Sequence, residues 1–224
     1  MRSKENKGTA FTGLAGGAHY KRWSKLFGMN EKFYRQGLGG LALGQGMQAL
    51  DLGCGPGALS FALAETAHPD AAILGLDISD DQLAYARSQA HGFPCALEFR
   101  NASMDEIPYP DETFDLVMSS MALHETPPAV RRAAIRETAR VLKTNGVFLL
   151  VEWSRPKLGL WGAIWLPLIA RGEKNKDNWN NAYPALCRDQ GLFLEEDRYI
   201  NSLARRQLFR KGSPAKADMG GPVA

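Results

Sequence analysis

Short apolar runs alternate with longer helical runs through the middle of this chain, and this alternation constrains its fold more than any other feature. Strand-like runs cover residues 47–52, 71–77, 96–102, 114–122 and 147–153. Helical runs between them cover residues 58–67, 80–90 and 127–143. Strands joined through helices run parallel, and strands that are apolar along their length are covered on both faces. The pattern therefore predicts a parallel sheet with helices on both sides.

Local signals mark the ends of two of these helices. Ser79 is placed to cap the helix over 80–90, and the acidic residues of its first turn interact favourably with the helix dipole. The helix over 127–143 begins at a proline, and the tripeptide at 144–146 (TNG) is expected to end it.

Composition and charge narrow the range of partners. The chain has 224 residues and a formal net charge of +3, and its Lys and Arg residues are scattered rather than gathered in a stripe, so a nucleic-acid partner is not expected. The three cysteines lie far apart without a CxxC pair, which argues against zinc and against a disulfide framework. Because the sequence shows no secretory signal and no membrane-spanning apolar run, we expect a cytoplasmic protein.

A glycine-rich turn follows the first strand in the segment ALDLGCGPG, residues 49–57. Its pattern, G-x-G-x-G, is one residue shorter than the dinucleotide fingerprint G-x-G-x-x-G. Pro56 removes a backbone donor that a pyrophosphate would need, and Asp51 places an acid just before the turn. An acid repels phosphate and attracts a cation, so the turn suits the ammonium and sulfonium groups of S-adenosylmethionine better than it suits NAD.

A second acid, Asp77, ends the next strand, 20 residues after Gly57. A carboxylate in this place can accept hydrogen bonds from both hydroxyl groups of a ribose. NAD-binding proteins share this feature, so Asp77 discriminates between the two cofactors only in combination with the turn.

Four segments carry a resemblance to a known family: ALDLGCGPG, LGLDIS, NASMDEIPYPDETFDLV and RVLKTNGVFLLVE. In order and spacing they resemble the motifs of the class I S-adenosylmethionine-dependent methyltransferase superfamily. They are most similar to its branch of ubiquinone/menaquinone C-methyltransferases and bacterial phospholipid N-methyltransferases. We therefore expect an α/β three-layer sandwich with a seven-stranded, mostly parallel Rossmann-like sheet that ends in an antiparallel hairpin.

The expected organisation is a single methyltransferase domain over 19–211 between a flexible leader (1–18) and a disordered tail (212–224). Its parts would be an N-terminal cap (19–45), a cofactor-binding core (46–153), a substrate or lid region (154–191) and two final strands (192–211). Asn201–Ser202 would form the turn between those strands, and Pro184 would bend or offset a helix over 178–191.

The resemblance implies roles for the residues of the glycine-rich turn. Gly53, Gly55 and Gly57 would line the methionine end of the cofactor, and Asp51 would reach its ammonium group directly or through water. Cys54 lies within the turn without a partner that would activate a nucleophile, so we interpret it as a small loop residue.

The resemblance also implies contacts to the rest of the cofactor. Asp77 would hold the ribose, and Ile78 would pack against the adenine. Ser103, followed by Met104, occupies the position where the family often has an Asp or Asn that contacts the adenine amine, and this departure weakens the expected side-chain contact. Ser119 would lie below the methionine moiety.

His124, with Glu125 beside it, is the candidate general base. It follows the fourth strand, at the carboxyl end of the sheet where ligands bind in open α/β folds. A histidine there can take a proton from a phenol or an amine. A hydrogen-bonded structural histidine is an equally open interpretation.

Aromatic residues on both sides of the core suggest how the substrate is covered. Tyr20 and Trp23 would close the pocket and stabilise the sulfonium by cation–π attraction, unless they only pack. Trp161 and Trp165 lie in an apolar segment that would form a lid, touch a membrane surface peripherally, or be a plain core helix.

These features predict direct in-line methyl transfer to a small lipophilic or aromatic acceptor, without a metal. Three alternatives stay open: a non-catalytic protein that binds or senses S-adenosylmethionine, an NAD-dependent oxidoreductase, and a methyltransferase that acts on protein or RNA. The sequence does not define the oligomeric state.

Overall fold

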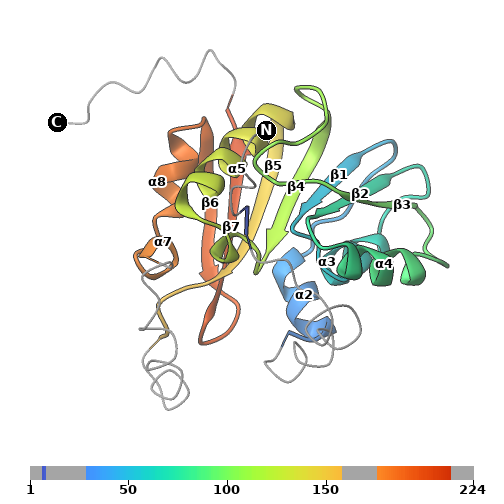
Figure 1. Ribbon diagram of the computed structural model, residues 1–224, viewed down its shortest axis with the longest axis horizontal. Helices are drawn as coiled ribbons and strands as arrows, with labels where there is room; N and C mark the ends of the chain where they lie inside the picture. Colours follow the sequence, from blue (N-terminus) through green and yellow to red (C-terminus); the bar gives the residue numbers. More distant parts are fainter. Residues whose placement is uncertain (1–6, 9–28, 158–175, 213–224) are drawn as a thin grey trace, which may run out of the picture.

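A seven-stranded sheet forms the centre of the protein (Figure 1), in a computed structural model that describes residues 7–8, 29–157 and 176–212. The strands are β1 (Gln48–Leu52), β2 (Ala72–Asp77), β3 (Ala96–Asn101), β4 (Phe114–Ser120), β5 (Leu142–Trp153), β6 (Leu192–Tyr199) and β7 (Ala204–Lys211). Their order across the sheet is β3-β2-β1-β4-β5-β7-β6. Strands β1 to β5 pair in parallel, whereas β7 pairs antiparallel with β5 on one side and with β6 on the other.

The strand order reverses between β1 and β4. The chain proceeds outward from β1 to β2 and β3, and then returns to the centre to place β4 on the other side of β1. In an open α/β sheet such a reversal leaves a crevice outside the carboxyl ends of the two central strands, where ligands bind. The topology therefore directs attention to the residues that follow β1 and β4.

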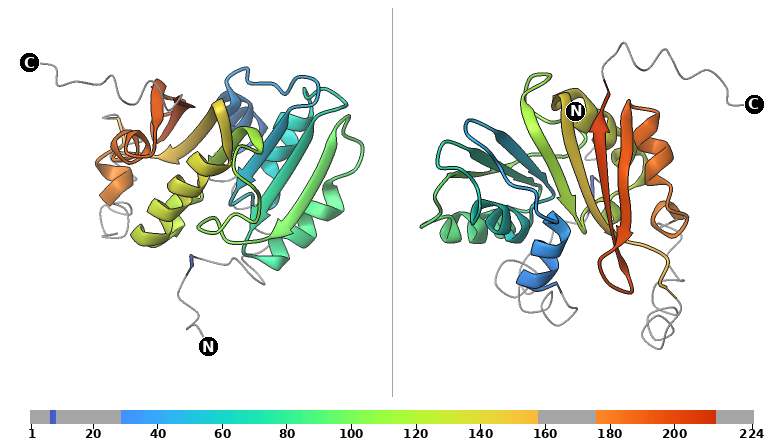
Figure 2. Two further views of the ribbon diagram at one scale, coloured as in Figure 1. Left: turned by 90° about the horizontal axis from the view of Figure 1, so that it is seen from above. Right: turned by 180° about the vertical axis from the view of Figure 1, so that it is seen from behind.

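Helices cover both faces of the sheet (Figure 2). On one face α5 (Pro128–Val141) and α8 (Tyr183–Arg188) bury their apolar side chains with those of the strands. On the other face lie α2 (Glu31–Leu38), α3 (Ala58–Ala64) and α4 (Asp80–Gln89). The three expected layers and the expected final hairpin are confirmed.

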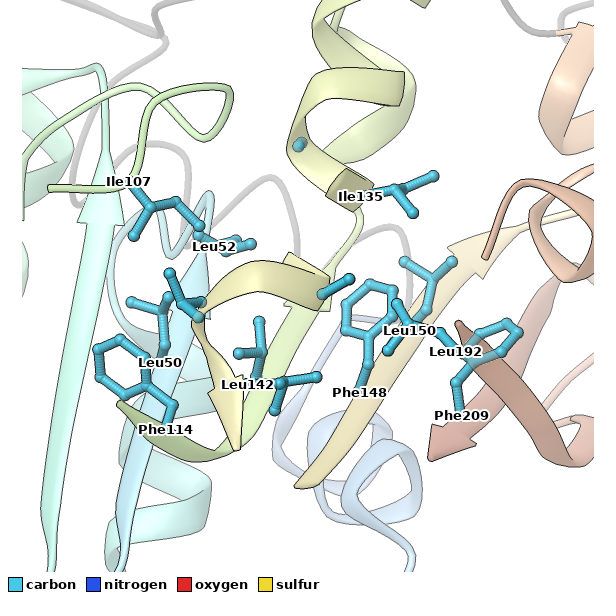
Figure 3. Close-up of a cluster of buried hydrophobic side chains, with 14 of the residues drawn as sticks. Leu50, Leu52, Ile107, Phe114, Ile135, Leu142, Phe148, Leu150, Leu192 and Phe209 are labelled. Carbon is cyan, nitrogen blue, oxygen red and sulfur yellow. The ribbon is translucent and has the colours of Figure 1, made fainter. Parts of the chain in front are cut away.

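Alternation along the strands divides the core between these faces. Leu50 and Leu52 belong to the cluster under α5, which Figure 3 shows with Ile135 of that helix. Ala49, which directly precedes Leu50, belongs to the cluster under α2 and α3. Successive side chains of a strand point to opposite faces, so a strand that is apolar throughout serves both clusters.

Two local expectations have different outcomes. Ser79 caps α4 as predicted, because its hydroxyl accepts a hydrogen bond from the backbone N–H of Gln82 at 3.4 Å. The TNG tripeptide at 144–146, in contrast, does not end a helix: α5 ends at Val141, and β5 begins at the next residue. Phe114 of β4 pairs with Leu142, and pairing resumes between Leu116 and Val147. The tripeptide therefore lies in an irregularity of the strand pairing, where Asn145 has a φ of +65°, and the helix ends before it.

The chain around Pro184 forms two short helices. These are α7 (Lys176–Trp179) and α8, with Pro184 in the first turn of α8. Proline is tolerated there because the first turn has no intrahelical partner for its missing N–H. None of the helices that the structure describes is long and apolar enough to cross a membrane.

Candidate cofactor site

The glycine-rich turn leaves β1 in a conformation that needs glycine. Gly53 has a φ of +68°, and a Cβ added to it would lie 2.5 Å from the Cβ of Ala122 in the connection after β4. Any side chain at this position would therefore push the two loops apart. The turn and the β4–α5 connection fit closely against each other because residue 53 has no side chain.

Hydrogen bonds within the protein already use the amides at the start of the turn. Gly53 and Cys54 both donate to the carbonyl of Leu76, at 2.8 and 3.0 Å. Gly55 donates to Oδ2 of Asp77 at 2.8 Å. A pyrophosphate needs free N–H groups that converge on it. These three amides do not offer that, which agrees with the expectation that the turn is not a dinucleotide-binding loop.

Asp77 is held rigidly at the carboxyl end of β2. Its Oδ1 accepts a hydrogen bond from the N–H of Ser79 at 2.8 Å, in addition to the bond from Gly55. Burial raises the pKa of this carboxyl, and the hydrogen bonds oppose that rise. The carboxylate therefore has a fixed direction toward the hollow described below.

Asp51, near the end of β1, is more deeply buried, with 1% of its surface exposed. Its Oδ2 accepts a hydrogen bond from the Ser60 hydroxyl at 2.7 Å. Burial, together with the charge of Asp77 and against that hydrogen bond, raises the pKa of Asp51 to about 7. No cationic side chain of the described residues lowers the pKa of either carboxyl.

The two acids face one hollow that opens to solvent, and its empty space, counted together with the open solvent at its mouth, is about 850 Å³. Eight of the ten residues expected to bind cofactor line it, and so does the substrate-side candidate Glu125. The eight are Asp51, Gly53, Cys54, Gly55, Asp77, Ile78, Ser103 and Met104. The structure thus brings together residues from the ends of β1, β2, β3 and β4.

Three of the expected residues have other surroundings. Ser119 is fully buried, does not line the hollow, and donates from its hydroxyl to the carbonyl of Leu52 at 2.9 Å. Gly57 is the N-cap residue of α3, with a φ of +84°, and is not among the lining residues. Ser103 lines the hollow, but its hydroxyl donates to Asp105.

Two lining residues that the sequence analysis did not single out have buried oxygen atoms without a hydrogen-bond partner among the described residues. These atoms are Oε1 of Gln82, in the first turn of α4, and Oγ of Ser120, which ends β4. Leaving a buried acceptor unsatisfied costs about 1–3 kcal/mol. A ligand with hydroxyl, amino and ammonium groups, as in S-adenosylmethionine, would satisfy both oxygens, so the residues present fit that cofactor.

Strand alternation explains why Ser120 replaces Ser119 in the lining. Consecutive residues of a strand point to opposite faces, so only one of the two serines can face the hollow. Gln82 is one turn into α4, and only the three-dimensional structure shows that its side chain is buried with no partner.

His124 lies between two carboxylates. Its Nδ1 is 2.8 Å from Oε2 of Glu152, and its Nε2 is 3.2 Å from Oε1 of Glu125. Burial acts to lower the pKa of His124, but the two carboxylates outweigh burial and raise this pKa to about 10. The two carboxylates therefore favour the charged form of the imidazole, which has no lone pair to accept a proton. The role of His124 as a general base stays a prediction.

The aromatic candidates Tyr20, Trp23, Trp161 and Trp165 lie outside the described residues. Of the predicted leader, the structure describes Lys7 and Gly8, which line the same hollow. The ammonium group of Lys7 is 3.0 Å from Oδ2 of Asp105.

Comparisons with known proteins agree with this geometry. A family model described as a methyltransferase domain matches residues 49–146. An uncharacterized methyltransferase of Synechocystis is 33% identical over 187 residues, covering 83% of this chain and 81% of the relative. A demethylmenaquinone methyltransferase of Lactobacillus johnsonii is 30% identical over 191 residues, covering 82% of this chain and 71% of the relative.

A solved structure, from the complex between the Haloferax volcanii Trm112 methyltransferase activator and a methyltransferase, superposes with a TM-score of 0.69 at 20% identity. The match covers 86% of this chain and 95% of that one. The fold, the carboxylate-lined hollow and the similarity along most of the Synechocystis relative together lead to one assignment: the chain belongs to the class I S-adenosylmethionine-dependent methyltransferases.

Proposed function

We propose that this methyltransferase transfers the methyl group of S-adenosylmethionine to a small, lipophilic or aromatic acceptor. The observation that carries the proposal is the set of side chains, other than the two acids, that line the hollow. The lining also includes apolar and aromatic side chains, namely those of Tyr34, Leu59, Met104, Met121 and Ala122. A demethylmenaquinone methyltransferase among the relatives supports an acceptor of this kind.

The cofactor roles that we propose follow from the surroundings of each acid. Asp51 would pair with the ammonium group, because this buried carboxylate has no cationic partner among the described residues. Asp77 would accept hydrogen bonds from the ribose hydroxyls, and Ile78 would contact the adenine. Gly53 and Gly55 would let the methionine end approach the backbone closely.

The cofactor supplies an activated methyl group, so the protein needs mainly to align the acceptor and exclude water. The tight contact between Gly53 and Ala122 serves both needs, since it fixes the two loops that border the hollow. His124 would hold Glu125 in place rather than take a proton, because its pKa is near 10.

Two measurements on the purified protein test the proposal. Calorimetry with S-adenosylhomocysteine first establishes cofactor binding, with Asp77→Asn as the variant expected to weaken it. Incubation with methyl-labelled cofactor and fractionated cell extract then identifies the acceptor. We expect label in the lipid and quinone fraction.

Each other outcome has a distinct meaning. Label only in polar small molecules, in protein or in RNA would contradict the proposed acceptor but keep the enzyme class. Binding of the cofactor product without transfer to any fraction would favour the non-catalytic alternative. Liposomes added to the assay test the predicted peripheral membrane contact separately, because transfer to a soluble quinone analogue does not require them.

A further inference from the structure

A buried carboxylate, Glu152, stands at the carboxyl end of β5 behind the wall of the hollow. It is 3% exposed. Its Oε1 accepts hydrogen bonds from the backbone N–H groups of Ala122 and Leu123, at 2.9 and 2.8 Å. These two residues begin the connection between β4 and α5, so one side-chain oxygen holds the backbone of that connection.

The second oxygen of Glu152 is equally occupied. Its Oε2 contacts Nδ1 of His124 at 2.8 Å and accepts a hydrogen bond from the side-chain amide of Asn178 at 3.1 Å. Asn178 also donates to the carbonyl of Trp153 and accepts from the Tyr183 hydroxyl at 2.7 Å. The carboxylate thus has four donors from two separate parts of the chain, which compensate for its removal from water.

The connection that Glu152 holds forms one wall of the cofactor hollow. Met121, Ala122 and Glu125 line the hollow, and Ala122 is the residue that fits against Gly53. Met121 has a φ of +53°, which is costly for a residue with a side chain. A backbone conformation of this kind persists only when its surroundings hold it. The next two residues, Ala122 and Leu123, donate their backbone N–H groups to Glu152.

We infer that Glu152 is a positioning residue: through its bonds to the β4–α5 connection, and with His124 as its charged partner, it sets the wall of the cofactor site. The inference rests on S-adenosylmethionine binding, which the family assignment supplies, and not on the identity of the acceptor.

The charge of His124 depends on several groups around it. Glu125 faces it from the same connection, and Glu152 faces it from β5. Farther out, Arg131 of α5 pairs with Asp177 of α7, and Tyr183 of α8 reaches the network through Asn178. Glu152 is the nearest acid, so neutralising it removes the main group that keeps His124 protonated.

The variant Glu152→Gln tests the inference, because it keeps the shape and removes the charge. The side-chain oxygen of a glutamine can still accept hydrogen bonds from the N–H groups of Ala122 and Leu123. Its NH₂ group would then face the N–H of a protonated His124, and two donors cannot form a hydrogen bond with each other. Neutral His124 could instead accept from that amide. We therefore expect S-adenosylhomocysteine to bind about tenfold more weakly at pH 6, with partial recovery at pH 8 to 9. NMR should show His124 titrating between pH 6 and 9 in the variant only.

Asp115→Asn is the matched control. Asp115 also accepts a backbone N–H, from Gln48 at 2.9 Å, and pairs with Lys143 at 2.8 Å, but it lies at the start of β4, away from the hollow. Its loss should leave the affinity for S-adenosylhomocysteine unchanged. Two results would overturn the inference: a folded Glu152→Gln variant that binds S-adenosylhomocysteine as tightly as the wild type, or a loss of affinity that is the same at every pH.

If Glu152→Gln does not fold, hydrogen exchange of the wild-type protein decides. The Ala122 and Leu123 amides should exchange at least about tenfold more slowly than an open turn, because each bond to a carboxylate must break first. Exchange at the rate of an open turn would overturn the inference. Failure of the wild-type protein to bind S-adenosylhomocysteine would instead challenge the cofactor site itself.

Discussion

Two buried carboxylates, Asp51 in one wall of the hollow and Glu152 behind the other, are compensated in opposite ways. On the β4–α5 side, Glu152 has four hydrogen-bond donors, one of them the charged His124. On the side of the glycine-rich turn, Asp51 has the Ser60 hydroxyl and lies near a second acid, Asp77. Structural acids are normally satisfied inside the protein, whereas acids that await a cation are not. The comparison separates Glu152, which holds the site in shape, from Asp51, which is expected to bind the cofactor.

The largest effect that would test this contrast is expected from Asp51→Asn. Removing the charge should weaken the binding of S-adenosylhomocysteine about 30- to 100-fold, because a charged hydrogen bond to the ammonium group is lost. Folding stability should not fall, since a buried charge with no cationic partner disappears. Calorimetry and thermal unfolding measure the two quantities.

A truncated ligand provides the control for that variant. 5′-Methylthioadenosine lacks the amino-acid part, so its affinity should be the same for wild type and Asp51→Asn. An equal loss for both ligands would mean that Asp51 shapes the pocket rather than pairs with the ammonium group, and the contrast between the walls would disappear.

A smaller effect is expected from pH alone. Free Asp51 has a pKa of about 7, and a bound ammonium group would favour its ionised form. Binding therefore requires loss of a proton below pH 7 and not above it, so the affinity should fall roughly tenfold from pH 8 to pH 6. Calorimetry across this range checks the slope, and Asp51→Asn should abolish it. An affinity of the wild type that does not change with pH would show that Asp51 and Glu152 do not differ as described.

The smallest effect is expected from Gln82→Met, which keeps the length of the side chain and removes the oxygen that has no partner among the described residues. A neutral hydrogen bond contributes about 0.5–1.5 kcal/mol, so S-adenosylhomocysteine should bind about three- to tenfold more weakly. Analogues without the adenine amino group or without a ribose hydroxyl identify the donor, because the matching analogue should bind wild type and variant equally. Unchanged affinity for the natural ligand would remove Gln82 from the site.

Local sequence predicts much of the fold and one wall of the site. The alternation of strands and helices, the cap at Ser79 and the acids Asp51 and Asp77 all depend on residues close in sequence. The TNG segment shows the limit, since Leu142 already pairs with Phe114 of another strand and the helix therefore ends before the turn-like residues.

The other wall depends on contacts between distant residues. His124 and Glu152 are 28 residues apart and meet only because β4 and β5 lie side by side. The sequence offers a histidine at the expected edge of the sheet, but its charge depends on a partner that periodicity does not reveal. Ser119 and Ser120 illustrate the same limit at smaller scale, because strand phase decides which serine faces the ligand.

The bonds from Gly53 and Cys54 to the carbonyl of Leu76 have a kinetic consequence. They tie the turn to β2 through groups of the protein itself, so the turn does not need a ligand to become ordered. Less conformational entropy is then lost on association, and encounter by diffusion rather than rearrangement of the turn should set the rate at which this side of the site fills.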